Sequence, residues 1–140
     1  MLGNILIDTN ILCSLLLQQN DYANTEKFFA KSDEFNLQIS VLDFSIYSIC
    51  LLLTRRQEHK VVGRLLKFIE NRRNIKIYRP NFSDINAVAD QKIKLDFEDG
   101  LHYYLAKKKN LTFISYDSDF DKTDLKRLTP SQALTELNLS

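Results

Sequence analysis

Three acidic side chains stand where strands are expected to end or helices to begin. Asp8 directly follows the apolar run ILI, Asp117 follows the run LTFISY, and Asp99 lies near the start of a helical pattern. Active sites of α/β folds gather beyond the carboxyl ends of strands, where carboxylates from separate segments could converge. Their repulsion would be tolerable mainly with a divalent cation between them. Oxygen ligands without a Cys or His cluster favour Mg²⁺ or Mn²⁺, and the natural chemistry of such a site is phosphoryl transfer.

Each carboxylate also has a simpler explanation. Asp8, or Asn10 after it, could cap the following helix by accepting backbone N–H bonds. Asp117 lies in YDSDFD, whose Asp and Ser side chains readily bond their own backbone in a turn. Asp96 is a candidate N-cap, and the two acids that follow it occupy a first turn favoured by the helix dipole. Capping and metal binding both remain open at these positions.

The elements that must position these residues alternate between strands and helices. Short apolar or alternating runs predict strands at 4–7, 36–40, 75–78 and 111–115. Runs with helical spacing predict helices at 21–32, 58–73, 83–94 and 96–109. Asp21 is the expected N-cap of the first helix, Ser83 or Asn81 that of the third, and one face of the second carries Val61, Val62, Leu65, Leu66 and Ile69. The alternation predicts an α/β fold with a mainly parallel sheet covered by helices on both faces.

Composition narrows the class further. A chain of 140 residues with 44% hydrophobic side chains and only three Gly predicts one globular domain, 1–140, and excludes disordered or fibrous proteins. Nineteen basic against eighteen acidic residues exclude a globally basic nucleic-acid-binding protein. Cys13 and Cys50 lie in apolar runs and are expected to be reduced core residues. No run resembles a membrane span or a secretion signal, so a cytoplasmic protein without a membrane partner is expected.

Charge is nevertheless unevenly distributed. Residues 55–79 contain nine Lys or Arg against Glu58 and Glu70, whereas residues 96–124 contain seven acids against four Lys. The basic segment could line the path of an RNA backbone, or it could be a solvated helix face. The best candidates for phosphate contact are Arg55, Arg56, Arg72 and Arg73.

Other side chains that could do chemistry have weaker support. Tyr103 and Tyr104 could stack on bases, but a helical core stripe is the preferred interpretation. His102 is expected to be a structural or surface residue, and His59 receives no catalytic role. No Gly-rich phosphate loop, Ser-His-Asp order or Cys-His pair is present. Haloacid dehalogenase-like phosphatases need a second Asp two residues after the first, where this chain has Asn10.

The chain contains, in this order, the segments ILIDTNIL, LDFEDGLHYYLAKKKNLTFISYDSDFDK and LKRLTPSQAL. Together these segments resemble the PIN-domain ribonucleases, especially VapC-type toxins of toxin-antitoxin systems. The resemblance implies a three-layer α/β/α sandwich, a Mg²⁺- or Mn²⁺-dependent endoribonuclease with an RNA substrate, a homodimer and a cognate antitoxin protein. It assigns Asp8, Asp99 and Asp117 to the metal site. Asn10 and Ser115 become its polar supports, with Asp119 as a possible auxiliary ligand.

One residue of the family pattern is missing. The family usually places a Glu in the helix after its second strand, where this chain has Ile46 or Ser48, depending on the register. Asp43 could cap this helix, which is the preferred interpretation, or substitute from one turn earlier. Glu98 is another possible compensator, although on a helix it points about 100° away from its neighbour Asp99.

The sequence therefore predicts a metal-dependent endoribonuclease in which water is the nucleophile and Asp117 or Asp119 helps to orient it. The alternative is a catalytically weakened PIN-fold module that binds RNA or protein without cleaving it. A toxin that cleaves only a structured RNA such as tRNA would resemble that module in tests with generic RNA.

Overall fold

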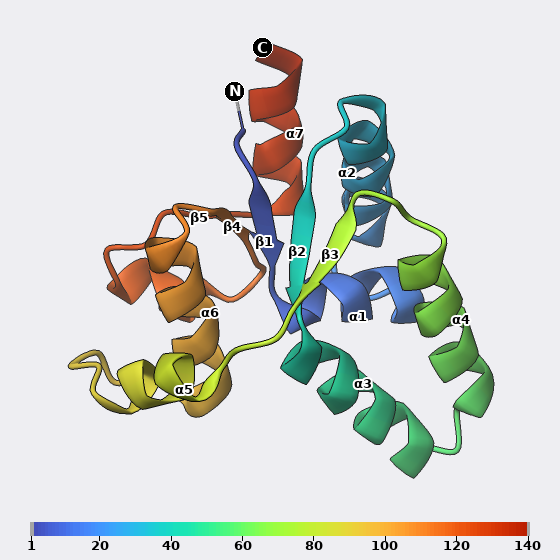
Figure 1. Cartoon of the computed structure of the whole chain (residues 1–140). Coiled ribbons are helices and arrows are strands. Elements are labelled where there is room, and N and C mark those ends of the chain that lie inside the picture. The colour runs from blue at the N-terminus through green and yellow to red at the C-terminus, as the bar shows by residue number, and fades with distance from the viewer. Residues whose placement is uncertain (1, 140) are drawn as a thin grey trace.

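Five short strands form one parallel sheet in the computed structural model, which describes residues 2–139 (Figure 1). The strands are β1 (Ile5–Ile7), β2 (Ile39–Leu42), β3 (Ile75–Tyr78), β4 (Thr112–Ile114) and β5 (Arg127–Leu128). Their order across the sheet is β3-β2-β1-β4-β5, and every neighbouring pair is parallel. Met1 and Ser140, the ends of the expected 1–140 domain, lie outside the described residues.

Helices connect the strands and cover both faces of the sheet. They are α1 (Thr9–Leu17), α2 (Tyr22–Glu34), α3 (Asp43–Arg55), α4 (His59–Glu70), α5 (Phe82–Ala89), α6 (Phe97–Lys108) and α7 (Pro130–Leu139), with a short 3₁₀ helix, η1 (Ser118–Lys122). Across residues 2–139, no helix has the length and apolar character that crossing a bilayer requires.

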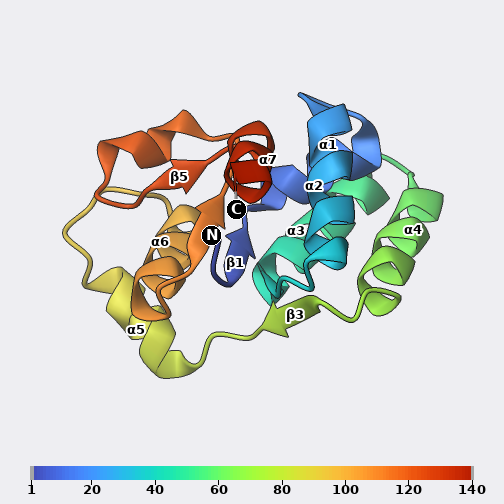
Figure 2. The same ribbon diagram turned by 90° about the horizontal axis from the view of Figure 1, so that it is seen from above.

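Side-chain alternation along the strands creates two apolar cores. Ile5 and Ile7 pack into a core with α1, α2, α3, α4 and α7, whereas Leu6 between them packs against α5 and α6. Figure 2 shows α5 and α6 on one side of the molecule and α2 and α4 on the other. Strands buried on both faces are typical of parallel sheets. The fold is therefore the predicted three-layer α/β/α sandwich.

The four predicted strands and four predicted helices are present with differences at their ends, whereas β5 and α7 have no counterpart among them. The strand predicted at 36–40 starts too early, because Asn36 adopts a left-handed φ of 50° and the Leu37 N–H bonds the Ser32 carbonyl at the end of α2. β2 consequently begins at Ile39. The two-residue strand β5 is absent from the prediction, because so short a segment has no periodic pattern.

The helix predicted at 83–94 begins at Phe82 and ends at Ala89. Asn81 caps it as expected, because its side chain accepts a hydrogen bond from the Asp84 N–H, and Asp84 bonds back to the Asn81 N–H. Asp21 occupies the N-cap position of α2, but its side chain makes no capping bond there.

Two expectations about the core need correction. Leu66 is exposed, although Leu65 and Ile69 on the same helix are buried. Cys13 and Cys50 are free thiols, but both are only half-buried and pack at the border of the core.

Close packing fixes the position of α6, the helix that carries Glu98 and Asp99. A Cβ on Gly100, in the first turns of α6, would lie 2.9 Å from Val88 Cγ1 on α5. Only glycine therefore lets α5 approach α6 at this point.

Candidate active site

The site lies where the connections from the sheet diverge. From β1 the chain passes to β2 on one side of it, whereas β4 lies on the other side. Open α/β sheets usually bind ligands in a crevice beyond the carboxyl ends of such strands, here β1 and β4, and this region is called the crevice below. Asp8 follows β1 and Ser115 follows β4, and pairing of Ile7 with Ile114 sets them side by side. The Asp8 N–H also donates to the Ile114 carbonyl over 3.0 Å.

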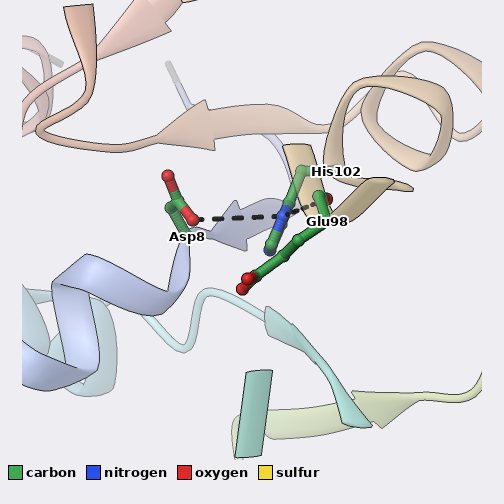
Figure 3. Close-up of side chains that lie close together, drawn as sticks. All are labelled: Asp8, Glu98 and His102. Atoms are coloured by element: carbon green, nitrogen blue, oxygen red, sulfur yellow. Dashed lines mark hydrogen bonds and ion pairs between the residues drawn. The ribbon is translucent and has the colours of Figure 1, made fainter. Parts of the chain in front are cut away.

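Asp8, Glu98 and His102 form the centre of this crevice (Figure 3). One side-chain ligand atom from each residue lies within 4.8 Å of the other two. Asp8 and His102 are buried, and Glu98 is partly exposed. His102 Nδ1 lies 3.9 Å from Asp8 Oδ1 and 3.0 Å from the Glu98 carbonyl oxygen.

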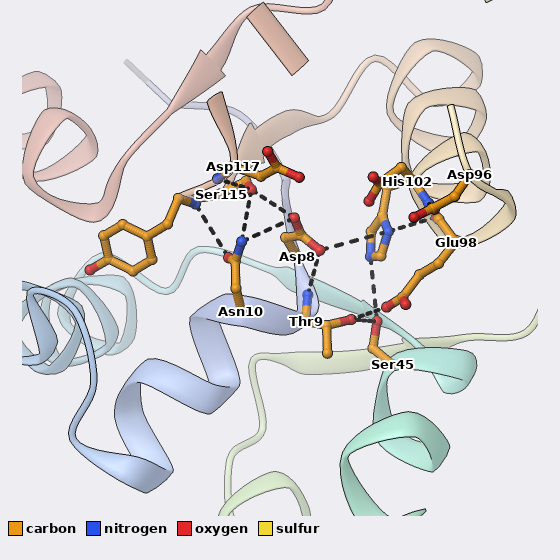
Figure 4. Close-up of polar contacts among 11 residues, drawn as sticks. Asp8, Thr9, Asn10, Ser45, Asp96, Glu98, His102, Ser115 and Asp117 are labelled. Carbon is orange, nitrogen blue, oxygen red and sulfur yellow. Dashed lines mark hydrogen bonds and ion pairs between the residues drawn. The ribbon is translucent and has the colours of Figure 1, made fainter. Parts of the chain in front are cut away.

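The position of the Asp8 carboxylate is fixed by neighbouring donors (Figure 4). Ser115 Oγ donates to Asp8 Oδ2 over 2.7 Å, and the Thr9 N–H donates to Oδ1 over the same distance. Asn10 Nδ2 lies 3.4 Å from Oδ2, and Asn10 Oδ1 accepts from the Tyr116 N–H. Asp8 therefore caps α1 and also lies in the crevice, so the two readings of this residue are compatible.

Asp117 and Asp99 border the same crevice. Asp117 Oδ1 accepts from the Asp119 N–H, so Asp117 caps η1 as the turn interpretation expects. The Asp99 N–H donates to Asp96 Oδ1, so Asp96 is the N-cap of α6. Burial, together with the charges of Asp96, Asp8, Asp117 and Glu98, raises the pKa of Asp99 to about 7. The three predicted ligands are thus electrostatic neighbours, although each of Asp8 and Asp117 also has a capping role.

Asp119 lies beside this group rather than within it. It shares with Asp99 the wall of a cavity of about 360 Å³ between η1 and the start of α6, which Lys94 and Lys122 also line. Asp119 is exposed, and its Oδ1 lies 3.4 Å from Lys122 Nζ.

Three site residues escaped the sequence prediction. Thr9 Oγ1 donates to Glu98 Oε1 and lies 2.7 Å from Ser45 Oγ, which in turn lies 3.4 Å from His102 Nε2 (Figure 4). Thr9 and Ser45 carried no sequence signal beyond their place next to Asp8 and in the helix that lacks its Glu. His102, expected to be a structural or surface residue, is fully buried in the site, where it is one of the three residues that could hold a metal ion.

Of the residues weighed for the missing Glu, Glu98 lies in the crevice, whereas α3 contributes no carboxylate to the cluster of Asp8, Glu98 and His102. Ile46 packs into the apolar core. Asp43 is the first residue of α3, and its Oδ1 accepts from the Phe44 N–H over 2.7 Å, in agreement with a capping role. α3 instead contributes Ser45 to the site, whereas α6 contributes Glu98.

None of the four candidate phosphate-binding arginines belongs to the cluster of Asp8, Glu98 and His102, and their contact with RNA stays a prediction; the charge of Arg56 acts on Cys13, as do the charges of Asp8 and Glu98. Arg72 and Arg73 precede β3 and so lie at the opposite end of the sheet. Arg72 forms an ion pair with Asp33, and its guanidinium lies 4.4 Å from the centre of the Phe68 ring. Arg55 and Arg56 end α3, roughly 15 Å along the helix from Ser45 at 1.5 Å per residue.

Comparisons with known proteins agree with this architecture. Mycobacterium tuberculosis VapC20, a toxin that cleaves the sarcin-ricin loop, superposes with a TM-score of 0.71 at 12% identity, over 88% of this chain and 97% of that one. VapBC2 from Rickettsia felis, bound to a promoter DNA fragment, gives 0.69 at 13% identity, covering 89% and 97%. A toxin-antitoxin complex from Klebsiella pneumoniae gives 0.62 at 18% identity, covering 91% and 98%. At these identities the likeness is one of fold.

A search of curated proteins found no significant sequence match. The sequence model of the PIN domain, in contrast, matches residues 5–126, which run from the first residue of β1 to the residue before β5. This range includes every carboxylate of the crevice. The chain therefore belongs to the PIN-domain family.

Proposed function

We propose that this PIN-domain protein is a Mg²⁺- or Mn²⁺-dependent endoribonuclease and the toxin of a toxin-antitoxin pair. The family and the fold support a nuclease of this class. Among structures with the same fold are a toxin that cleaves the sarcin-ricin loop and a toxin-antitoxin complex.

The environment of Asp99 carries this proposal. A carboxylate whose pKa is raised to about 7 by burial and by four neighbouring acids is unfavourably placed as an anion. A divalent cation would remove that repulsion, and carboxylate oxygens are the ligands that Mg²⁺ and Mn²⁺ prefer. The residues present therefore fit a hard divalent cation.

In this proposal Asp8, Asp99 and Asp117 hold the cation. When bound, the cation supplies a Lewis acid that activates water and neutralises charge on the scissile phosphate. Ser115 and Asn10 orient Asp8 through their hydrogen bonds to its carboxylate. Asp117, or Asp119 at the cavity wall, orients the attacking water.

The proposal includes the surroundings of the enzyme. Residues 1–140 act as one PIN-like domain in the cytoplasm, as a homodimer that a cognate antitoxin neutralises. Toxin-antitoxin complexes among the proteins of similar fold support the antitoxin partner.

The test is cleavage of labelled RNAs by the purified chain, with Mn²⁺ and with EDTA. The panel contains single-stranded RNA, tRNA and a sarcin-ricin loop, because VapC20 cleaves that loop. We expect cleavage of at least one RNA with Mn²⁺, none with EDTA and none by Asp8→Asn, whose circular dichroism spectrum stays native. Cleavage that persists in EDTA or in folded Asp8→Asn contradicts the proposal.

A second function is favoured by one observation, the burial of Ile46 where the family usually has a Glu. A catalytically weakened module would bind RNA or protein without cleaving it. Failure to cleave any RNA of the panel, combined with Mn²⁺ binding weaker than millimolar, would favour this module over the nuclease.

A further inference from the structure

We propose that Glu98 on α6, positioned by Thr9 and Ser45, supplies the carboxylate that α3 of this chain lacks at the metal centre. The inference rests on the proposed function, because it needs a divalent cation in the crevice. It assigns Thr9 and Ser45 as positioning residues, which act through Glu98.

The first step is that one residue fixes two carboxylates. The Thr9 N–H donates to Asp8 Oδ1, and the Thr9 hydroxyl donates to Glu98 Oε1. Side-chain oxygens of Asp8 and Glu98 lie within 4.8 Å of each other. Oxygen atoms on opposite sides of a cation with bonds of about 2.1 Å are about 4.2 Å apart, so a small movement lets both bind one ion.

The second step concerns the hydroxyl proton of Thr9. Thr9 Oγ1 contacts both Glu98 and Ser45 Oγ, yet a hydroxyl has one proton to donate. Thr9 Oγ1 is the donor in both contacts, and an ionised carboxylate can only accept, so the one Thr9 proton serves Glu98 while Ser45 Oγ stays in contact 2.7 Å away. Ser45 therefore orients Thr9, and the charge-assisted bond to Glu98 is the stronger of the two.

The third step concerns Nδ1, the ring nitrogen of His102 that lies 3.9 Å from Asp8 Oδ1. Nδ1 also lies 3.0 Å from the Glu98 carbonyl oxygen, which can only accept, so Nδ1 carries a proton and has no lone pair for a cation. His102 Nε2 faces Ser45 Oγ, and the ring lies against Phe113. His102 thus supports the first turn of α6 through Nδ1, and of the three residues in the cluster Asp8 and Glu98 supply oxygen ligands.

The fourth step is that α3 offers no carboxylate at this place. Ile46 lies in the core, and Asp43 Oδ1 bonds the Phe44 N–H. Ser45, fully buried, is the polar group by which α3 reaches the network. In this inference the carboxylate comes from α6 and not from α3. α3 contributes the Ser45 hydroxyl, which contacts Thr9, the residue that bonds Glu98.

The experiment measures Mn²⁺ affinity of the purified chain by isothermal titration calorimetry, without RNA. Thr9→Val keeps the shape of the side chain and removes its hydroxyl, whereas Thr9→Ser keeps the hydroxyl. We expect Glu98→Gln and Thr9→Val each to weaken Mn²⁺ binding roughly 10–100-fold, a size typical when support of a metal site is lost. Thr9→Ser stays within about threefold of the parent, because the donor to Glu98 remains.

A double variant separates positioning from a general effect on folding. If Thr9 acts through Glu98, Thr9→Val adds little in the Glu98→Gln background. Melting temperatures measured in EDTA show whether each variant folds, and Asp43→Asn is the matched acidic control on α3. Parent-like affinity of Glu98→Gln, equal affinities of Thr9→Val and Thr9→Ser, or additive losses in the double variant would each overturn the inference while the nuclease proposal stands. Absence of Mn²⁺ binding to the parent chain would overturn both.

Discussion

The first turns of α3 and α6 meet at Thr9, yet they differ sharply in charge. α6 begins with Asp96 as its N-cap and has Glu98 and Asp99 in its first turn. α3 has a single acid there, Asp43, whose Oδ1 accepts from the Phe44 N–H, and Ile46 three residues later enters the apolar core. The comparison shows that α6 supplies acidic side chains to the crevice, whereas α3 supplies mainly apolar side chains that pack in the core.

The concentration of acids at the start of α6 has an electrostatic cost, because their negative charges repel one another. The N-terminus of a helix favours negative charge by about 0.3–1 kcal/mol per residue, which offsets only part of the repulsion among several acids. The raised pKa of Asp99 is the visible result. On the other side, Ser45 is neutral and buried with hydrogen-bond partners, so α3 contributes order without further charge.

Removing one acid from α6 and one from α3 gives the largest expected difference between the metal-binding role of α6 and the packing role of α3. We expect Asp99→Asn to lower RNA cleavage by on the order of 10³-fold, because a proposed cation ligand is lost, whereas Asp43→Asn stays within about threefold. Initial rates with saturating Mn²⁺ measure both. Equal losses in the two variants would mean that α3 contributes a carboxylate after all.

The packing of α6 against α5 can be disturbed by a substitution that leaves every carboxylate in place. Gly100→Ala should destabilise the fold by about 1–3 kcal/mol, because its Cβ would lie 2.9 Å from Val88 Cγ1. Gly63→Ala on α4 is the control: nothing lies within 4 Å of its Cβ, so helix propensity alone should stabilise the protein by about 0.5–1 kcal/mol. Urea unfolding measures both, and a neutral Gly100→Ala would show that α6 is loosely seated.

The acidic side also predicts how stability changes with pH. The pKa of Asp99 is about 7 in the folded chain and 3.8 as the reference value, so between these values the folded state holds the extra proton. Stability from this group is complete below pH 4 and is lost as pH rises through 7. In EDTA we therefore expect the melting temperature to fall across this window by a few degrees, corresponding to about 1 kcal/mol after discounting for solvent exposure.

Asp99→Asn should flatten that fall and raise the melting temperature at pH 8, since no charge develops at position 99. Thermal unfolding at pH 5 and pH 8 in EDTA, for the parent and the variant, decides the matter. A melting temperature of the parent that rises toward pH 8 more than that of the variant would contradict the raised pKa.

The smallest effect is expected on α3. Asp43→Asn keeps an acceptor for the Phe44 N–H and removes one charge near a helix N-terminus, so we expect a loss of at most about 1 kcal/mol. Urea unfolding at low salt measures it, and the loss should shrink in 0.5 M salt because the effect is electrostatic. A larger, salt-independent loss would place Asp43 in a more extensive network.

Local patterns in the sequence predict the frame of the site well. Asp8 directly follows β1, Asp117 comes two residues after Ser115 beyond β4, and a parallel sheet brings the ends of neighbouring strands together. The N-cap pattern around Asp96 similarly predicts the start of α6. In each case the signal lies within a few residues of the position that it explains.

The hydrogen-bond network that joins the helices could not be predicted in the same way. Thr9 and Glu98 are 89 positions apart, and Ser45 and His102 are 57 apart. No periodicity links such pairs, because their contact depends on how α3 and α6 pack around β1. The position of Arg72 also depends on tertiary packing. The basic segment alone predicts a phosphate contact for Arg72, whereas in the fold its guanidinium packs against Phe68 at the far end of the sheet.

The most direct test of the proposed metal centre is a crystal of the chain soaked in millimolar Mn²⁺ and measured at the manganese absorption edge. We expect an anomalous peak in the crevice, about 2.1 Å from carboxylate oxygens of Asp8, Asp99 or Asp117, with Glu98 in reach of the same ion. Density for manganese only outside the crevice, or none at all, would contradict a metal-dependent nuclease site here.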